Sequence, residues 1–319
     1  KLTAIFPKIL YFVQKGVNLN EDDPNYDVKK LAIKTSAARI YPDVINVDDL
    51  SKLKGAEKPI TAMGCRSFLH YWEDENGIET YTGRNNLGVI SINLPHLALQ
   101  ARGNVAAFFS ALDDTLELVR RGLHVKEDSV IQTELELLPI MYTQGGLGDP
   151  TGKKTVRDFY DGNRYKQASI SIGYVGVHNA MVALTGQEDW HEDVEYNDLG
   201  LTIVRYLDDY ATKIDGEFLA KPSVYATPSE SLADRFAHID RQRFGLIKGV
   251  NDQEYYENSF HYPSNKSIDP ISKMIFEAQY YKYTPGGFMF YIEQSNLSEN
   301  LKAMEAFWDS FHYFGNIYA

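Results

Sequence analysis

Hydrophobic and polar residues alternate along the chain in blocks that predict strands followed by helices. Loose alternation at residues 3–13 predicts a strand, and the apolar run at residues 87–94 predicts a strand covered on both faces. After Asn104, apolar residues recur at intervals of three and four and predict a helix through His124. Its buried stripe comprises Val105, Phe108, Phe109, Leu112, Leu116, Val119 and Leu123.

The remaining pattern continues this alternation. Further strands are expected at residues 44–47, 78–81, 167–177, 223–226 and 288–293. Further helices are expected at residues 24–41, 48–54, 95–101, 178–185, 196–214 and 228–244, within 270–283, and at 298–313. Asp23 is the expected N-cap of the first of these helices. Alternating strands and helices imply parallel strands in a barrel or a doubly wound sheet. We expect the barrel, because no Gly-rich dinucleotide fingerprint follows the early strands.

Composition limits the classes of partner. A chain of 319 residues with 44% apolar content can bury a large core, and without a long linker we expect one domain over residues 1–319. A net charge of −12 argues against nucleic acid or an anionic membrane as a general partner, so any phosphate contact must be local. No apolar run approaches the length of a membrane span.

A single cysteine, Cys65, excludes an internal disulfide framework, and no His pairs with it at zinc-site spacing. We therefore expect a cytoplasmic protein with no metal site in this chain. A lone cysteine is usually a small buried hydrophobe. Here Gly64 precedes the thiol, Arg66 follows it, and the apolar run at residues 60–63 ends beside it, which favours a loop tip.

Three other stretches have two readings each. Residues 227–231 follow a strand and read as a capped helix start, with Thr227 as N-cap and Glu230 closing a capping box, or as a phosphate cradle. The pair Gly286 and Gly287 reads as a turn or as a place where backbone approaches a ligand. Asn86, at the head of a strand, either caps a turn or points an amide into a site.

Seven short motifs, in order along the chain, resemble the anaerobic (class III) ribonucleoside-triphosphate reductases. They are TAIFPK at residues 3–8, MGCR at 63–66, GRNNLGVISINLP at 83–95, SISIGYVGVH at 169–178, ATPSES at 226–231, NSFH at 258–261 and NLKAMEA at 300–306. Each is weak alone, but their order makes the resemblance specific over essentially the whole chain.

The resemblance implies a ten-stranded α/β barrel of the glycyl radical enzyme type, with a finger loop inside it that carries Cys65. It implies that a thiyl radical on Cys65 abstracts the 3′ hydrogen of a ribonucleotide, after which water leaves C2′. Asn86 would orient a ribose hydroxyl, and Arg66 would be structural. The implied substrate-binding residues are Met63, Ser67, Thr227, Ser229, Glu230, Ser231, Gly286 and Gly287. The family often has His where Phe288 stands, so that position receives no chemical role.

The family also implies groups that this sequence lacks. These are a radical-bearing glycine, a four-cysteine zinc site, a second active-site cysteine and a region that binds the effectors ATP and dNTPs. Formate would be the reductant, a radical-SAM iron–sulfur enzyme would generate the glycyl radical, and the whole protein would be a homodimer. We therefore expect a fragment without the N-terminal half of the barrel and the C-terminal radical and zinc region.

Two alternatives remain open at this point. A lyase of the pyruvate formate-lyase type shares the superfamily, but such enzymes carry paired adjacent cysteines, whereas Cys65 stands between Gly64 and Arg66. A non-catalytic α/β nucleotide-binding or scaffold protein would instead bury its one cysteine in the core.

Overall fold

The computed structural model describes residues 8–39, 41–64, 66–74, 76–161, 167–292, 297–315, 317 and 319. The chain forms two compact units. Unit 1 comprises Lys1–Ile60, Lys266–Gln279 and Met289–Ala319, and unit 2 comprises Thr61–Asn265 and Tyr280–Phe288. Both units therefore combine segments that are far apart in the sequence.

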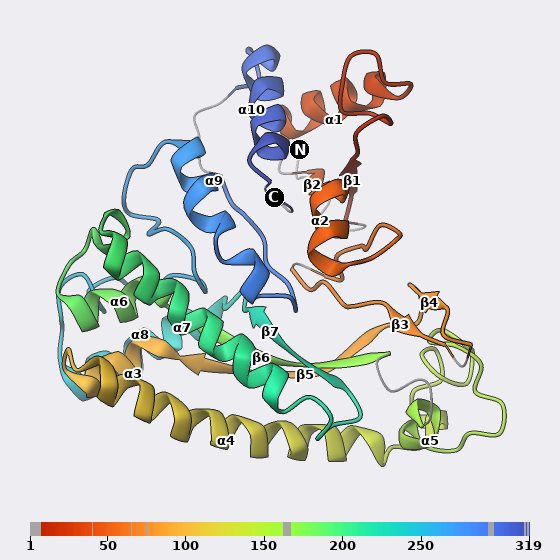
Figure 1. Cartoon of the computed structure of the whole chain (residues 1–319), viewed down its shortest axis with the longest axis horizontal. Coiled ribbons are helices and arrows are strands. Elements are labelled where there is room, and N and C mark those ends of the chain that lie inside the picture. Colours follow the sequence, from red (N-terminus) through yellow and green to blue (C-terminus); the bar gives the residue numbers. More distant parts are fainter. Residues whose placement is uncertain are drawn as a thin grey trace. The chain divides into compact units, whose positions relative to one another are not determined.

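Unit 1 contains one pair of parallel strands and four helices within its described residues. β1 (Leu10–Val13) pairs with β2 (Asp43–Asn46), from Leu10 opposite Asp43 to Val13 opposite Asn46. The helices are α1 (Tyr26–Ala38), α2 (Val47–Lys54), α9 (Pro270–Ala278) and α10 (Leu301–Tyr313) (Figure 1). Their core consists of Val13, Ala32, Ile33, Val44, Met274, Phe290, Trp308 and Phe311.

Unit 2 is built on a parallel sheet with strand order β5-β6-β7. The strands are β5 (Asn85–Asn93), β6 (Ala168–Val175) and β7 (Lys221–Ala226). A separate antiparallel pair joins β3 (Trp72–Glu73) to β4 (Glu79–Thr80). Every residue of the central strand β6 is buried, as expected for a strand with a neighbour on each side.

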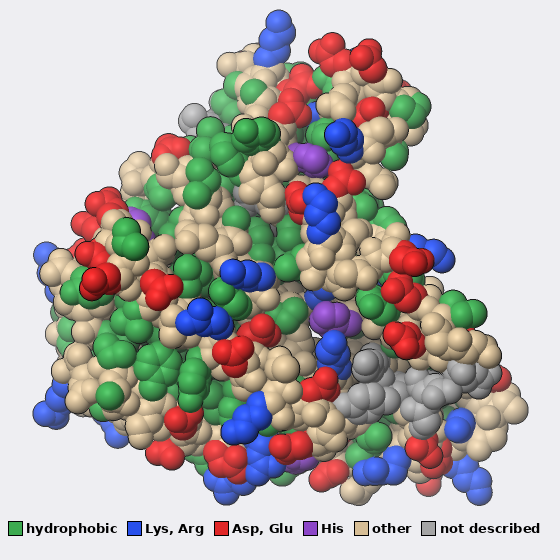
Figure 2. Space-filling view, viewed as in Figure 1, with side chains coloured by type: hydrophobic (Ala, Val, Ile, Leu, Met, Phe, Trp, Pro, Cys, Tyr) green, Lys and Arg blue, Asp and Glu red, His purple; other side chains and the backbone are tan. Residues whose placement is uncertain are grey.

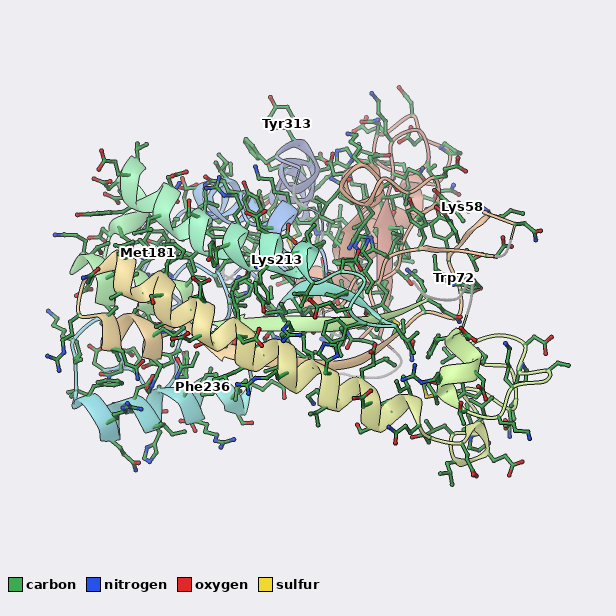
Figure 3. The ribbon with its side chains drawn as sticks, turned by 60° about the horizontal axis from the view of Figure 1, so that its bottom comes forward. Lys58, Trp72, Met181, Lys213, Phe236 and Tyr313 are labelled. Carbon is green, nitrogen blue, oxygen red and sulfur yellow. The ribbon has the colours of Figure 1, made fainter. Side chains whose placement is uncertain are left out.

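Helices follow each strand of this sheet. They are α3 (Leu94–Ala101), α4 (Val105–Ile131), α5 (Val156–Tyr160), α6 (Val177–Thr185), α7 (Val194–Lys213) and α8 (Ser231–Phe244). Within the part of the chain that the structure describes, three 3₁₀ turns lie at Leu135–Leu137, Trp190–Glu192 and Tyr281–Tyr283. α4 packs on β5 and α7 on β7, so both cover the sheet. Figure 3 locates α6, α7 and α8 by their residues Met181, Lys213 and Phe236.

Parallel pairing and the alternation of strands with helices agree with the predicted fold class. Asn104 caps α4 as expected, because its Oδ1 accepts a hydrogen bond from the Ala107 N–H at 3.0 Å. The helix continues to Ile131, seven residues beyond its predicted end at His124. Gly186 ends α6 with a left-handed backbone, also as expected.

Three further predictions about these elements are wrong. Asp23 does not cap α1; it accepts from the Asn20 N–H at 2.8 Å, so it closes the preceding turn and the helix begins at Tyr26. Residues 288–292, the described part of the predicted strand 288–293, form no strand. The helix predicted from Pro228 begins only at Ser231.

The described residues include no helix that is both long and apolar enough to cross a membrane. On the face seen in Figure 2, basic and acidic side chains are interspersed, without a continuous basic surface.

Candidate functional site

The segment around the cysteine reverses direction between Met63 and Ser67. The Met63 N–H donates to the Ser67 carbonyl at 2.7 Å, and the Ser67 N–H donates back at 3.2 Å. Gly64 has a φ of +58°, which favours glycine at that position. We call this segment the 63–67 hairpin. Cys65 lies within it in the sequence, but that residue is outside the part of the chain that the structure describes.

The 63–67 hairpin is attached to the sheet through Gly286 and Gly287. The Gly286 N–H donates to the Val224 carbonyl at 2.7 Å, and the Ala226 N–H donates to the Gly287 carbonyl at 2.9 Å. On the other side of the glycine pair, the Phe68 N–H donates to the Gly286 carbonyl at 3.0 Å. The glycine pair thus extends the backbone ladder from β7 to the hairpin.

Both glycines allow this close approach. A Cβ atom on Gly286 would lie 2.5 Å from the Val224 carbonyl oxygen, and one on Gly287 would lie 2.1 Å from the Arg66 carbonyl oxygen. Gly287 also has a φ of +139°, in the range that favours glycine. The contacts that exclude a side chain here come from the protein's own backbone.

Arg66 provides a second attachment of the hairpin. Its side chain is 1% exposed, and Nη1 donates to the carbonyl oxygens of Ala226 and Thr227, both at 3.3 Å. Those carbonyls lie at the carboxyl end of β7, where parallel sheets commonly bind ligands. Nearby, burial raises the pKa of Tyr174 well above its ordinary value, and the charge of Arg66 partly opposes that shift.

The segment after β7, residues 227–231, forms a strained turn rather than a capping box. Ser229 and Glu230 both have positive φ values, of 52° and 40°. Glu230 is the N-cap of α8 but makes no side-chain cap bond, and the predicted Thr227–Glu230 capping box is therefore wrong. The Ser229 hydroxyl instead donates to the Thr227 carbonyl at 3.1 Å. Left-handed residues other than glycine cost about 1 to 2 kcal/mol each, so the surrounding fold must hold this 227–231 turn in place.

One face of the sheet carries small polar side chains, which we call the polar sheet face. Its members are Asn86, Ser91, Ser169, Ser171, Ser223 and Thr227. Asn86 pairs with Ser169, and the Thr227 hydroxyl lies beside Gly173, four residues further along β6, which corresponds to about 13 Å along the strand. The other face carries the apolar residues Ile170 and Ile172, both fully buried. A parallel sheet in an α/β protein is usually apolar on both faces, so the serines mark this face as a candidate binding surface.

Gly173 leaves room on this face for a hydrogen bond between two strands. The hydroxyls of Ser91 and Thr227 lie 2.9 Å apart. A Cβ atom on Gly173 would stand 2.2 Å from Thr227 Oγ1 and 2.5 Å from Ser91 Oγ. The sequence contained a signal for this face that our prediction missed: Ser, Ile, Ser, Ile and Gly alternate with a period of two at residues 169–173.

Asn86 is held at the start of the polar sheet face. Its Nδ2 donates to Ser171 Oγ at 2.6 Å and to Ser169 Oγ at 3.2 Å, and its Oδ1 accepts from the Gly88 N–H at 2.8 Å. These bonds go to β6 and to its own strand, not to the 63–67 hairpin. The side chain therefore caps a local bulge, which agrees with one of the two readings left open by the sequence, and it lies on the polar sheet face. That its amide serves a site stays a prediction.

A second polar cluster, around Asp240 of α8, was not predicted. Asp240 is fully buried and accepts from Asn93 Nδ2 at 2.9 Å and from the Tyr256 hydroxyl at 2.8 Å, and it also pairs with His96 Nδ1. Burial, followed by the Asp240 charge, raises the pKa of Tyr256. The cluster ties α8 to the carboxyl end of β5. Its members come from three separate segments of the sequence, and no local pattern indicates it.

The structure thus places all described candidates in unit 2. Met63 and Ser67 belong to the 63–67 hairpin, and Gly286 and Gly287 join this hairpin to β7. The turn beyond β7 contains Thr227, Ser229, Glu230 and Ser231. Asn86 lies at the other end of the polar sheet face. The described residues contain no group of three or more His, Cys, Asp or Glu side chains placed to hold a metal ion.

Comparison with solved structures identifies the fold. The chain superposes on a structure titled "Anaerobic ribonucleotide reductase" with a TM-score of 0.66 and 16% identity, covering 98% of this chain and 44% of that one. A Thermotoga maritima anaerobic ribonucleotide reductase with dATP in its specificity site matches with a TM-score of 0.64 and 17% identity, covering 98% and 47%. This likeness confirms the predicted fold class, an α/β fold like that of the solved anaerobic ribonucleotide reductases. The number of ten strands and the finger loop stay predictions.

Comparison of sequences identifies the family. A family model described as "Anaerobic ribonucleoside-triphosphate reductase" matches residues 1–319. The proteins of that name from Escherichia coli and Enterobacteria phage T4 are 41% and 35% identical to this chain over 308 and 312 residues. These matches cover 96% and 97% of this chain but 43% and 49% of the two relatives, so the chain spans less than half of their length. The chain belongs to the anaerobic ribonucleoside-triphosphate reductase family.

Proposed function

We propose that this chain is the substrate-binding and radical-bearing part of an enzyme that reduces ribonucleoside triphosphates to 2′-deoxyribonucleoside triphosphates without oxygen. The observation that supports this most directly is the attachment of the 63–67 hairpin. Backbone bonds to Gly286 and the Arg66 side chain both fix it beside the carboxyl end of β7. The proposed reaction is inferred from membership of the family. The hydrogen bonds of the 63–67 hairpin support a fixed position for the segment that contains the cysteine.

In this proposal Cys65 carries the thiyl radical. It takes the 3′ hydrogen of the ribose, after which the C2′ hydroxyl leaves as water and C2′ receives hydrogen. The 3′ hydrogen then returns from the thiol to C3′, which restores the thiyl radical. Formate supplies the two electrons and becomes CO₂, so that one ribonucleotide, one formate and one proton give one deoxyribonucleotide, CO₂ and water. Hydrogen-atom transfer requires no thiolate, so the thiol needs positioning to within about 3 to 3.5 Å of its partner atom and exclusion of water, not a lowered pKa.

The polar sheet face is the proposed binding surface for the nucleotide. Asn86 would orient a ribose hydroxyl while Ser169 and Ser171 hold its amide. Met63 and Ser67 would flank the reacting thiol. The triphosphate would lie at the 227–231 turn, where N–H groups at the start of α8 and the hydroxyls of Ser229 and Ser231 suit an anion. Glu230 would face away from the phosphates, since it is exposed.

The family implies further components, which we propose for the whole protein. They are a glycyl radical formed by a radical-SAM iron–sulfur activating enzyme, a structural zinc ion, a second active-site cysteine, and the nucleotide effectors ATP and dNTPs. Solved relatives titled with dATP, and with dATP and CTP, support nucleotide effectors in such proteins. We propose that the whole protein is a cytoplasmic homodimer that makes DNA precursors.

Substitution of the cysteine in the full-length, activated protein tests this proposal. Cys65→Ser should abolish formate-dependent nucleotide reduction, because a hydroxyl cannot carry the radical that a thiol carries. Ribonucleoside triphosphate affinity, measured by direct titration of the same sample, should stay within about threefold, since the thiol is a small part of the binding surface. Retained reduction would refute the radical role.

A further inference from the structure

Arg66 connects two parts of the candidate site that lie 160 residues apart in the sequence. It follows Cys65 directly. Its backbone lies against Gly287, where a Cβ atom would come within 2.1 Å of the Arg66 carbonyl oxygen. Its side chain reaches the carbonyl oxygens of Ala226 and Thr227. One residue therefore fixes the 63–67 hairpin to the strand end from which the 227–231 turn begins.

A packing role alone does not explain this residue. An arginine stays charged in proteins, and burying a charge costs several kcal/mol unless its donors are bonded. An apolar side chain would fill the same space without that cost. The planar guanidinium, by contrast, offers several donors in fixed directions, so it can specify the relative position of two backbone segments.

The carbonyl of Thr227 is the point at which these contacts meet. It accepts from Arg66 Nη1 at 3.3 Å and from Ser229 Oγ at 3.1 Å. Thr227 also shares a hydrogen bond with Ser91 through its side chain. A movement of the 227–231 turn would therefore alter the bonds that hold Arg66.

We propose that Arg66 is a positioning residue that holds the 63–67 hairpin in register with the 227–231 turn. A nucleotide bound by its phosphates at the turn then presents its ribose to Cys65. This inference rests on the proposed function, because it takes the turn as the phosphate site and Cys65 as the reacting thiol. Arg66 itself contacts neither the ribose nor the phosphates.

The test uses the full-length, activated protein and two variants. Arg66→Lys keeps the positive charge but replaces the planar guanidinium, with its several fixed donors, by a single ammonium group on a shorter side chain. Arg84→Lys is the control, since Arg84 is half-buried and also donates from Nη1 to a backbone carbonyl, that of Leu69, at 2.8 Å, which lies outside the 227–231 turn. We expect Arg66→Lys to lower kcat at least tenfold with nucleotide affinity within threefold, because small misplacements of reacting atoms can cost about 100-fold. Arg84→Lys should change both quantities less than threefold.

A second readout does not depend on turnover. The alkylation rate of Cys65 by iodoacetamide in nucleotide-free protein, followed by mass spectrometry of its peptide, reports how firmly the hairpin is held. Arg66→Lys should raise this rate several-fold, and Arg84→Lys should not. Both variants are compared with the parent at a temperature below all three melting transitions, so that a general loss of stability does not produce the effect.

Two outcomes would overturn the proposal. If Arg66→Lys leaves kcat and the alkylation rate unchanged, the guanidinium does not position the hairpin. If its main effect is a tenfold or larger loss of nucleotide affinity, Arg66 binds the nucleotide itself. Failure of the proposed function is recognised separately, by nucleotide reduction that persists in Cys65→Ser.

Discussion

Gly287 lies so close to Arg66 that a Cβ atom at position 287 would stand 2.1 Å from the Arg66 carbonyl oxygen. The same glycine accepts a hydrogen bond from the Ala226 N–H at 2.9 Å. Backbone segments from three regions of the sequence therefore meet around one residue without a side chain. This meeting point fixes the hairpin that contains the cysteine.

Gly287→Ala should destabilise the chain by at least about 2 kcal/mol, since the new methyl group meets backbone that cannot rotate away and the φ of +139° adds strain. Gly216→Ala is the matched control. Gly216 has a φ of +98°, but a Cβ atom added there would have no heavy atom within 4 Å, so only the strain of about 1 to 2 kcal/mol should appear. Urea denaturation compares the two, and equal losses would contradict close packing at Gly287.

Gly173→Ala tests the spacing on the polar sheet face. The added methyl should cost about 1 to 3 kcal/mol, because it overlaps the hydroxyls of Ser91 and Thr227. In a Thr227→Ala background the nearest obstructing atom is gone, so the same change should cost about 1 kcal/mol less. A double-mutant cycle in urea measures this difference. Strict additivity of the two changes would show that Gly173 does not face Thr227.

Ser171→Ala and Ser223→Ala should differ although both serines are buried on the same face. Ser171 accepts from the half-buried Asn86 Nδ2 at 2.6 Å, so Ser171→Ala removes this hydrogen bond and should cost about 0.5 to 1.5 kcal/mol. The Ser223 hydroxyl is buried without a hydrogen-bond partner, so Ser223→Ala should be neutral or slightly stabilising. Urea denaturation midpoints of the two variants measure this difference in stability. A larger loss of stability in Ser223→Ala than in Ser171→Ala would show that Ser171 does not support Asn86.

The double change Ser229→Ala and Ser231→Ala should weaken ribonucleoside triphosphate binding by at least about tenfold, since a single hydrogen bond to a charged group contributes about 1.5 to 3 kcal/mol. Ser110→Ala, at an exposed position on α4, is the control and should leave the affinity unchanged. Calorimetric titration of the full-length protein provides the measurement. Unchanged affinity in the double variant would remove the 227–231 turn as the phosphate site.

Elements with strong local signals were predictable from the sequence. The apolar stripe of α4 has Phe108, Leu112 and Leu116 fully buried, and the Asn104 cap forms as expected. The Gly186 stop of α6 is similarly local. Such features depend on residues within one or two helical turns, so tertiary contacts do not alter them.

Features that depend on distant contacts were not predictable. The helix expected from Pro228 starts at Ser231, because Ser229 and Glu230 are held in a left-handed conformation that their residue types disfavour. The role of Gly286 and Gly287 depends on backbone from β7 and from the 63–67 hairpin, and the Asp240 cluster on residues from three separate segments. The role proposed for Cys65 came from the family resemblance, since composition alone favours a buried thiol.

A structure of the full-length protein with a bound ribonucleoside triphosphate tests the proposed site most directly. We predict the phosphates at the 227–231 turn, the ribose over the polar sheet face, and the Cys65 sulfur within about 3 to 3.5 Å of the 3′ hydrogen or its carbon. A nucleotide bound with its phosphates away from that turn, or with its ribose out of reach of Cys65, would contradict the proposed site.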